Sequence, residues 1–306
     1  MYRTILKKLE HYGYEIISPA CGYLACGDTG AGKMPEPETL LSYILREIAL
    51  IKDMKGVKVL VTAGPTQEKL DPVRFITNHS TGKMGYAIAE NCMRRGADVT
   101  LVTGPVAIAP PPFVKVVKVT SAFEMAEAVK ACYEEQQIII KTAAVADYRP
   151  AHVSDEKIKK MGNDTKENKK SIEMTTQNTV SENMAVTTSS SIKEAKTSMS
   201  QINLELERTE DILAFLGAHK QAGQFICGFS METENMLENS RAKLERKNVD
   251  MIVANNLKVK GAGFGTDTNV VTFITKDECI ENEIMSKADV AGAIVDFILT
   301  KMIMPI

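Results

Sequence analysis

Residues 62–85 contain the densest set of side chains that could do chemistry. Arg74, Asn78, Ser80 and Lys83 supply a guanidinium, an amide, a hydroxyl and an ammonium just before a segment with helical periodicity. A helix N-terminus presents unpaired N–H groups and the positive end of a dipole, so this set is suited to hold a phosphate or an acyl phosphate oxygen. A capped helix start with solvated charges uses the same residue types, and that alternative stays open.

Two further features point to the same kind of ligand. Asp147 follows a long apolar run, residues 137–146, and open α/β sheets bind ligands at the carboxyl ends of buried strands. Lys157, Lys159 and Lys160 form a dense basic cluster that could close over a triphosphate as a mobile flap. A solvated basic turn is the competing interpretation.

Other candidates have simpler alternatives. Lys243 and Lys247 lie one helical turn apart, where they could act together or remain on a solvated face. Residues 27–34 nearly match a phosphate-binding P-loop, but Met34 replaces its final Ser or Thr and prolines follow, so we favour a shaped loop. Cys26, beside that loop, is either a reactive thiol or a small buried hydrophobe.

The elements that must position these residues begin near residue 56, where strands alternate with helices. Such a pattern predicts an α/β fold with a Rossmann-like, mostly parallel sheet of seven or eight strands and helices on both faces. We expect strands at 57–63, 97–103, 114–119, 137–146, 225–229, 250–254 and 270–274, and helices at 84–95, 122–134, 209–221, 232–248 and 287–302. Thr209 is the expected cap of the third helix.

Two segments lie outside this pattern. Residues 1–52 predict a helix ending at Gly13, a strand at 14–18, a Gly-rich loop at 19–37 and a helix at 38–51, with too few apolar residues for an independent core. Residues 161–201 are rich in Ser, Thr, Asn and Lys, which predicts a disordered insertion before a half-buried strand at 202–207.

The overall composition is that of a globular protein. A net charge of −2 gives no electrostatic reason to bind nucleic acid or a membrane surface. The six cysteines are scattered and the four histidines lie far apart, so neither a disulfide framework nor a zinc site is indicated. The N-terminus lacks the apolar run of a signal peptide, and we expect a cytoplasmic protein.

Taken together, residues 64–66, 71–85, 143–148, 157–160, 228–229 and 263–269 closely resemble the phosphopantothenate-cysteine ligase family. The resemblance extends from about Gly56 to the C-terminus. It implies that residues 53–306 are a CTP-dependent ligase domain, usually dimeric, that acts in coenzyme A biosynthesis with Mg²⁺ or Mn²⁺. It implies that 4'-phosphopantothenate and L-cysteine are joined through an acyl cytidylate, with release of pyrophosphate and CMP. The metal ligands stay unknown.

The resemblance also implies roles for individual residues. Asn78 would stabilise the acyl cytidylate, Arg74 would assist it, and Lys157 would serve the second half-reaction and contact the nucleotide. The positions that match the family's CTP contacts are Asp147, Glu210, Asp211, Ile212, Leu213, Phe229, Lys243 and Lys247. Ser80 and Ala143 are expected to line the nucleotide site near them.

Residues 25–28 and 32–37 resemble the substrate clamp of a phosphopantothenoylcysteine decarboxylase domain, which the bacterial bifunctional enzyme carries ahead of its ligase. This resemblance implies that residues 1–52 are the C-terminal remnant of a flavin-type decarboxylase domain. Cys26 would then be an orphaned proton donor, because the FMN-binding part would precede Met1, and we do not expect this chain alone to bind FMN. An alternative function is a catalytically impaired subunit or regulator of a separate flavin decarboxylase.

Overall fold

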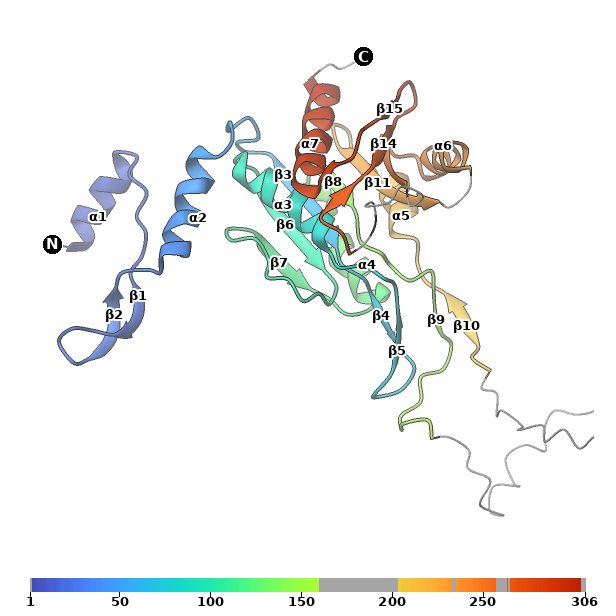
Figure 1. Ribbon diagram of the computed structural model, residues 1–306, viewed down its shortest axis with the longest axis horizontal. Coiled ribbons are helices and arrows are strands. Elements are labelled where there is room, and N and C mark those ends of the chain that lie inside the picture. Colours follow the sequence, from blue (N-terminus) through green and yellow to red (C-terminus); the bar gives the residue numbers. More distant parts are fainter. Residues whose placement is uncertain (1, 160–202, 233–234, 257–262, 264, 304–306) are drawn as a thin grey trace, which may run out of the picture.

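The structure is a computed structural model, and it describes residues 2–159, 203–232, 235–256, 263 and 265–303 (Figure 1). The insertion expected at 161–201 and Lys160 of the basic cluster lie outside the described residues.

A sheet of eight strands forms the centre of the molecule, in the order β15-β14-β12-β11-β8-β3-β6-β7 (Figure 1). In chain order these strands are β3 (Lys58–Ala63), β6 (Asp98–Thr103), β7 (Lys115–Lys118), β8 (Ile138–Lys141), β11 (Phe225–Glu232), β12 (Met251–Asn256), β14 (Val271–Ile274) and β15 (Cys279–Glu281). The strands from β7 to β12 pair in parallel, whereas β14 and β15 are antiparallel. The predicted mostly parallel sheet is therefore confirmed.

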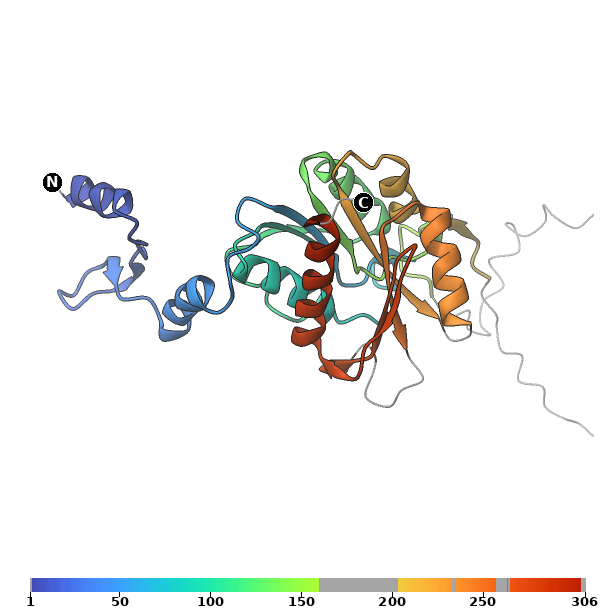
Figure 2. The same ribbon diagram turned by 90° about the horizontal axis from the view of Figure 1, so that it is seen from above.

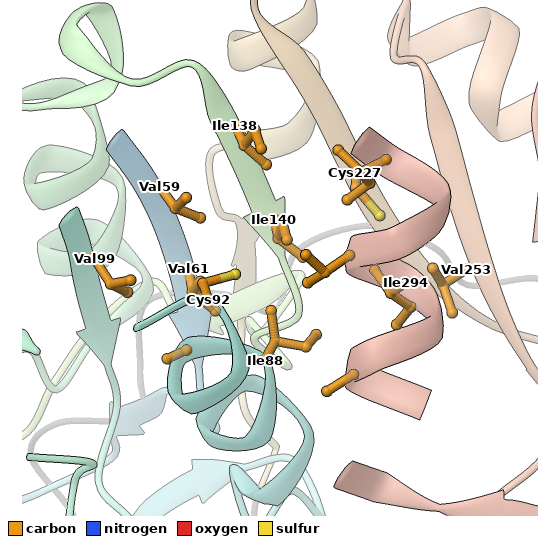
Figure 3. Packing of buried hydrophobic residues seen from close by; sticks show 14 of the residues in the cluster. Val59, Val61, Ile88, Cys92, Val99, Ile138, Ile140, Cys227, Val253 and Ile294 are labelled. Carbon is orange, nitrogen blue, oxygen red and sulfur yellow. The ribbon is translucent and has the colours of Figure 1, made fainter. Parts of the chain in front are cut away.

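Helices cover both faces of this sheet, as predicted. One face packs against α3 (Lys83–Arg94) and α7 (Lys287–Ile303), and the other against α4 (Ala122–Lys130), α5 (Ile212–Ala218) and α6 (Met236–Lys247). Successive residues of a strand point to opposite faces of the sheet. Alternate side chains of each strand therefore pack against the helices on one face or the other. Figure 3 shows the first layer, in which Ile88 of α3 lies near Val61 and Ile140, and Ile294 of α7 lies beside Val253.

Two predicted boundaries on the ligand side of the sheet are wrong. β8 ends at Lys141 rather than at residue 146, because the hydroxyls of Thr62 and Thr66 accept the backbone N–H groups of Ala143 and Ala146 in place of a strand partner. Thr209 does not cap the next helix. Its hydroxyl donates to the Ala146 carbonyl, and α5 begins only at Ile212.

Two short antiparallel strand pairs extend from the edge of the sheet where the strands end. One joins β4 (Gln67–Lys69) to β5 (Phe75–Thr77) inside the stretch 62–85, and the other pairs β9 (Tyr148–Pro150) with β10 (Leu206–Arg208). The half-buried strand predicted at 202–207 is only partly confirmed. β10 begins at Leu206, its three residues are exposed, and it lies outside the central sheet, whereas residues 203–205 are not in a strand. A third pair, β13 (Thr268–Asn269) and β16 (Met285–Ser286), leads into α7.

The N-terminal segment projects away from the sheet (Figures 1 and 2). It contains α1 (Tyr2–His11), a hairpin of β1 (Ala20–Tyr23) and β2 (Thr29–Lys33), and α2 (Pro37–Ile48). The strand predicted at 14–18 is absent, and the predicted loop at 19–37 is instead this hairpin. Gly27, at φ 89°, permits the tight turn in which its N–H donates to the Leu24 carbonyl.

The helix predicted at 122–134 divides into α4 and a 3-10 turn at Tyr133–Glu135. Among the helices described, none is both long and apolar enough to cross a membrane.

Candidate functional site

Two adjoining pockets open where the parallel strands end. The first, of about 500 Å³, is lined by the start of α3, by residues that follow β3 and β8, and by residues in the C-terminal halves of β11 and β12. The second, of about 370 Å³, lies between the end of β8 and the start of α5. Lys141, Val145, Asp147 and Lys243 line both pockets. This is the edge at which open α/β sheets bind ligands.

The N-terminus of α3 forms one wall of the first pocket. Its N-cap, Gly82, is left-handed at φ 75° and provides no side chain to cap the helix. Gly85, one turn in, lies so close to the sheet that an added Cβ would be 2.5 Å from Thr142 Oγ1 and 2.6 Å from Ala63 Cβ. Glycine at this position lets the positive end of the helix dipole reach the carboxyl edge of the sheet.

Asn78 connects this helix start to the segment after β8. Its amide nitrogen donates to the carbonyls of Ala144 (3.1 Å) and Val145 (3.2 Å). Ser80, two residues on, accepts the Gly82 N–H at 3.4 Å. Asn78 therefore holds together the two loops that form the floor of the first pocket.

A cluster of lysines lies at the junction of the two pockets. Lys243 Nζ donates to the Phe229 carbonyl at 3.0 Å, and Lys247 pairs with Asp211 at 2.5 Å. Asp211 also caps α5 by accepting the Ala214 N–H. Burial raises the pKa of Asp211, but the bonds from Lys247 and Ala214 outweigh burial, and the pKa is lowered overall.

Lys141, the last residue of β8, has a lowered pKa. Burial, together with the positive charge of Lys243, lowers its pKa to about 8, although Asp211 and Asp147 act in the opposite direction. The sequence interpretation missed Lys141 because it lay within an apolar run. The available signal was a single lysine five residues before the expected strand end.

The opposite end of the first pocket holds Lys287, a second lysine that sequence reasoning did not assign to a site. Lys287, at the start of α7, is 7% exposed and donates to the carbonyls of Gly263 and Thr266. Lys83 pairs with Asp267 at 2.6 Å. Burial lowers the pKa of Lys287, and the nearby Lys83 adds to this effect.

Most of the predicted nucleotide contacts come together here. Asn78, Ser80, Ala143 and Phe229 line the first pocket; Glu210, Asp211, Ile212 and Leu213 line the second; Asp147 and Lys243 line both; and Lys247 reaches the site through Asp211.

Arg74, Lys157 and Cys26 line neither pocket. The Arg74 guanidinium donates to the buried Asp71 carboxylate and to the Ile158 carbonyl at 2.6 Å, and Asp71 also accepts the Ile158 N–H. Asp71 and Arg74 thereby fasten the segment that carries the exposed Lys157 to the base of the β4–β5 hairpin. Cys26 is exposed in the turn between β1 and β2.

Among the described residues, no group of three or more His, Cys, Asp or Glu side chains could hold a metal ion. The site residues that suit a bound group are lysines and a helix N-terminus, which bind anions. A Mg²⁺ ion carried by a triphosphate needs only one or two carboxylates from a protein, and Asp147 at the junction fits that limited requirement.

Comparisons with known proteins agree with this architecture. The model of the DNA/pantothenate metabolism flavoprotein C-terminal domain matches residues 54–192 and 183–302. The coenzyme A biosynthesis bifunctional protein CoaBC of Bacillus subtilis is 42% identical over 283 residues, which are 91% of this chain and 60% of that protein. CoaBC of Escherichia coli is 39% identical over 282 residues, 90% of this chain and 61% of that protein.

A solved structure, the C-terminal domain of CoaBC, is 40% identical with a TM-score of 0.59, and the match covers 81% of this chain and 96% of that domain. This chain thus spans about 60% of the length of the curated relatives that it matches. The matched family model extends from the first strand of the sheet to the last helix. The chain belongs to the family of the DNA/pantothenate metabolism flavoprotein C-terminal domain.

Proposed function

We propose that this chain is a CTP-dependent phosphopantothenate-cysteine ligase of coenzyme A biosynthesis. The observation that carries the proposal is the pair of adjoining pockets, joined at Lys141, Asp147 and Lys243, beside the uncapped N-terminus of α3. One extended ligand with several negative charges fits this arrangement. Membership of the family and similarity to CoaBC supply the reaction class.

The reaction has two steps. In the first, the carboxylate of 4'-phosphopantothenate attacks the α-phosphate of CTP, which forms an acyl cytidylate and breaks the bond to pyrophosphate. In the second, the amine of cysteine attacks the acyl carbon, loses a proton and expels CMP, leaving an amide. Lysines and a helix N-terminus stabilise the charge that develops on the phosphate oxygens.

Asn78 is proposed to stabilise the acyl cytidylate. Its amide donates to the carbonyls of Ala144 and Val145, between the α3 loop and the segment after β8, and this position at the first pocket supports the proposal. Ser80 and Ala143 would line the same wall. Asp147, Phe229, Lys243 and Lys247, with residues 210–213, would contact CTP, and Mg²⁺ or Mn²⁺ would neutralise part of the triphosphate charge.

Lys157 is proposed to act in the second half-reaction from a segment that closes over the site. In the structure this segment is fastened by the Asp71 carboxylate and the Arg74 guanidinium through Ile158. Arg74 would therefore assist catalysis as a positioning residue, by holding the segment at the distance from which Lys157 reaches the intermediate.

Residues 1–52 are proposed to be the end of a decarboxylase domain, with Cys26 as its proton donor. Their apolar side chains support a partner surface: Tyr23, Met34, Ile48 and Ile51 are each more than 70% exposed, and no residue of α2 is buried. This exposure favours the second candidate function, a subunit that partners a separate flavin decarboxylase. Copurification with a flavoprotein, without ligase turnover, would support that candidate over the first.

Nucleotide specificity provides a direct binding test, because a ligand that binds only the folded state raises its melting temperature. With Mg²⁺ present, we expect CTP to raise the melting temperature more than ATP, GTP or UTP at equal concentration. A larger shift with ATP would refute the choice of base, and no shift with any nucleotide would refute the ligase. We also propose that the active form is a homodimer, which light scattering would test.

A further inference from the structure

Lys141 lies at the boundary of the two pockets and lines both. It ends β8, the strand between β3 and β11, and it is in register with Thr62 on one side and Gly228 on the other. Side chains in register on neighbouring parallel strands share a face, so Lys141 stands between a short side chain and no side chain at all. Neither of these two neighbours places a long side chain against Lys141, and Lys141 itself lines both pockets.

The space over Gly228 is closed on the side of the core. A Cβ added at Gly228 would be 2.7 Å from a methyl carbon of Leu213 and 3.0 Å from one of Ile252. Apolar atoms thus fill the space over Gly228, beside Lys141, while the pockets lie at the end of the strand. This arrangement buries the carbon chain of a lysine and directs its charged end toward the pockets.

Across the part of the chain that the structure describes, the Lys141 ammonium forms neither an ion pair nor a hydrogen bond, unlike Lys243 and Lys247 beside it. The charges that act on it are those of Asp211, Asp147, Lys243 and Lys247. A half-buried cation without a direct partner is unfavourable in the free protein. An anion bound at the junction would relieve that cost.

We propose that the Lys141 ammonium binds a phosphate group of a polyanionic ligand that lies across both pockets. Under the function proposed above, on which this inference rests, that ligand is the triphosphate of CTP. Lys141 then joins the two pockets into one nucleotide site, with Lys243 on the same phosphates and the α3 N-terminus at the far wall. The Lys141 ammonium contributes to CTP binding and stabilises the negative charge on pyrophosphate as it leaves.

The unusual titration of Lys141 gives this assignment a specific signature. With a pKa of about 8 in the free protein, Lys141 is largely charged at pH 7 and largely neutral at pH 9. A bound phosphate favours the charged form and raises the pKa, so binding at pH 8 takes up protons. Affinity for CTP accordingly falls as the pH rises from 7 to 9, through loss of the Lys141 charge.

The test is isothermal titration calorimetry of CTP with Mg²⁺ at pH 7, 8 and 9, in buffers of different ionisation enthalpy. The variant is Lys141→Met, and its matched control is Lys115→Met, an exposed lysine at the start of β7 that lines neither pocket. We expect Lys141→Met to weaken CTP binding at pH 7 by about 10-fold or more, the usual worth of a charged hydrogen bond. It should also flatten the pH profile and abolish proton uptake at pH 8.

Lys115→Met is expected to bind as the wild type does. Without ligand, Lys141→Met should melt no lower than the wild type, because it removes an unpaired, half-buried charge. A purely structural role for Lys141 would instead lower the melting temperature and leave proton uptake in place. Lys141→Arg, which keeps the charge, should retain most of the affinity and lose the pH dependence near 8.

Equal CTP affinity in Lys141→Met and wild type, with wild-type release of pyrophosphate, overturns the Lys141 assignment and leaves the ligase in place. Absence of both CTP binding and pyrophosphate release in the wild type overturns the proposed function together with the inference. The two failures are therefore distinguishable in the same set of titrations and product assays.

Discussion

Gly85 is the position at which one methyl group should disturb both stability and ligand binding. It lies in α3, against the carboxyl ends of β3 and β8, where a Cβ would meet Thr142 Oγ1 at 2.5 Å and Ala63 Cβ at 2.6 Å. Neither atom is the flexible end of a long side chain, so the helix must move outward. Overpacking of this kind costs about 1–3 kcal/mol, whereas Gly→Ala in a helix recovers at most about 1 kcal/mol.

The same substitution at Gly292 provides the matched control. Gly292 lies inside α7, and a Cβ there would meet only Asn91 Nδ2, at the ordinary contact distance of 3.6 Å. Gly292→Ala should therefore raise the free energy of unfolding by about 0.5–1 kcal/mol. Gly85→Ala should lower it by about 1–2 kcal/mol, so the two variants should differ in stability by roughly 2 kcal/mol.

Urea denaturation followed by circular dichroism measures this difference directly, since a shift in midpoint at constant slope reports stability. Binding of CTP supplies a second readout. An outward shift of α3 moves its N-terminus away from the first pocket, so Gly85→Ala should bind CTP more weakly, and Gly292→Ala should bind it as the wild type does. A Gly85→Ala protein at least as stable as the wild type would refute the close approach of α3 to the sheet.

Three further substitutions test individual roles. Asn78→Asp places a carboxylate oxygen against the two carbonyls to which Asn78 now donates. This should cost about 1–3 kcal/mol and prevent accumulation of acyl cytidylate. Mass spectrometry of quenched reactions that still shows the intermediate would contradict this prediction. Asp211→Ala removes the cap of α5 and should lower the free energy of unfolding by about 1 kcal/mol. Asp211→Asn keeps a hydrogen-bond acceptor, so its loss of unfolding free energy should be less than half as large. Equal losses in a urea titration would argue against capping. Lys157→Gln should still release pyrophosphate from CTP and 4'-phosphopantothenate but slow the formation of CMP after cysteine is added, and an equal fall in both products would remove its assignment to the second step.

Periodicity predicted the central sheet well because buried parallel strands leave continuous apolar runs between amphipathic helices. Most of the site residues that the resemblance selected, from Asn78 to Lys243, line one of the two pockets. Both kinds of reasoning succeed where local pattern and tertiary environment agree, as at β3 and α3.

The predicted element boundaries were wrong where a side chain, rather than the backbone, forms a hydrogen bond with a main-chain group. The hydroxyls of Thr62 and Thr66 end β8 early, and no periodicity reveals a hydroxyl that accepts a backbone N–H from a segment 80 residues away. The same early ending moves Lys141 from the inside of a supposed strand to the junction of two pockets. Thr209 was taken for a helix cap because its side chain suits that role, yet tertiary contact gives it to Ala146.

The position of Arg74 shows a different limit. Its charge and its place before α3 suggested direct contact with an acyl phosphate, but the structure fastens it to the nearby Asp71 and to Ile158, 84 residues away in the chain. The anion that an arginine contacts depends on which remote segments the fold brings next to it. The distance between such segments in the folded protein cannot be read from the sequence.

The most direct test of the central claim is a product assay with CTP, Mg²⁺ and 4'-phosphopantothenate, first without and then with L-cysteine. We predict that pyrophosphate appears without cysteine, in proportion to the protein, as the acyl cytidylate forms. Addition of cysteine should then release CMP and yield phosphopantothenoylcysteine, with one pyrophosphate for each CMP. Absence of pyrophosphate with CTP and with every other nucleotide, from protein that is folded, would contradict the account.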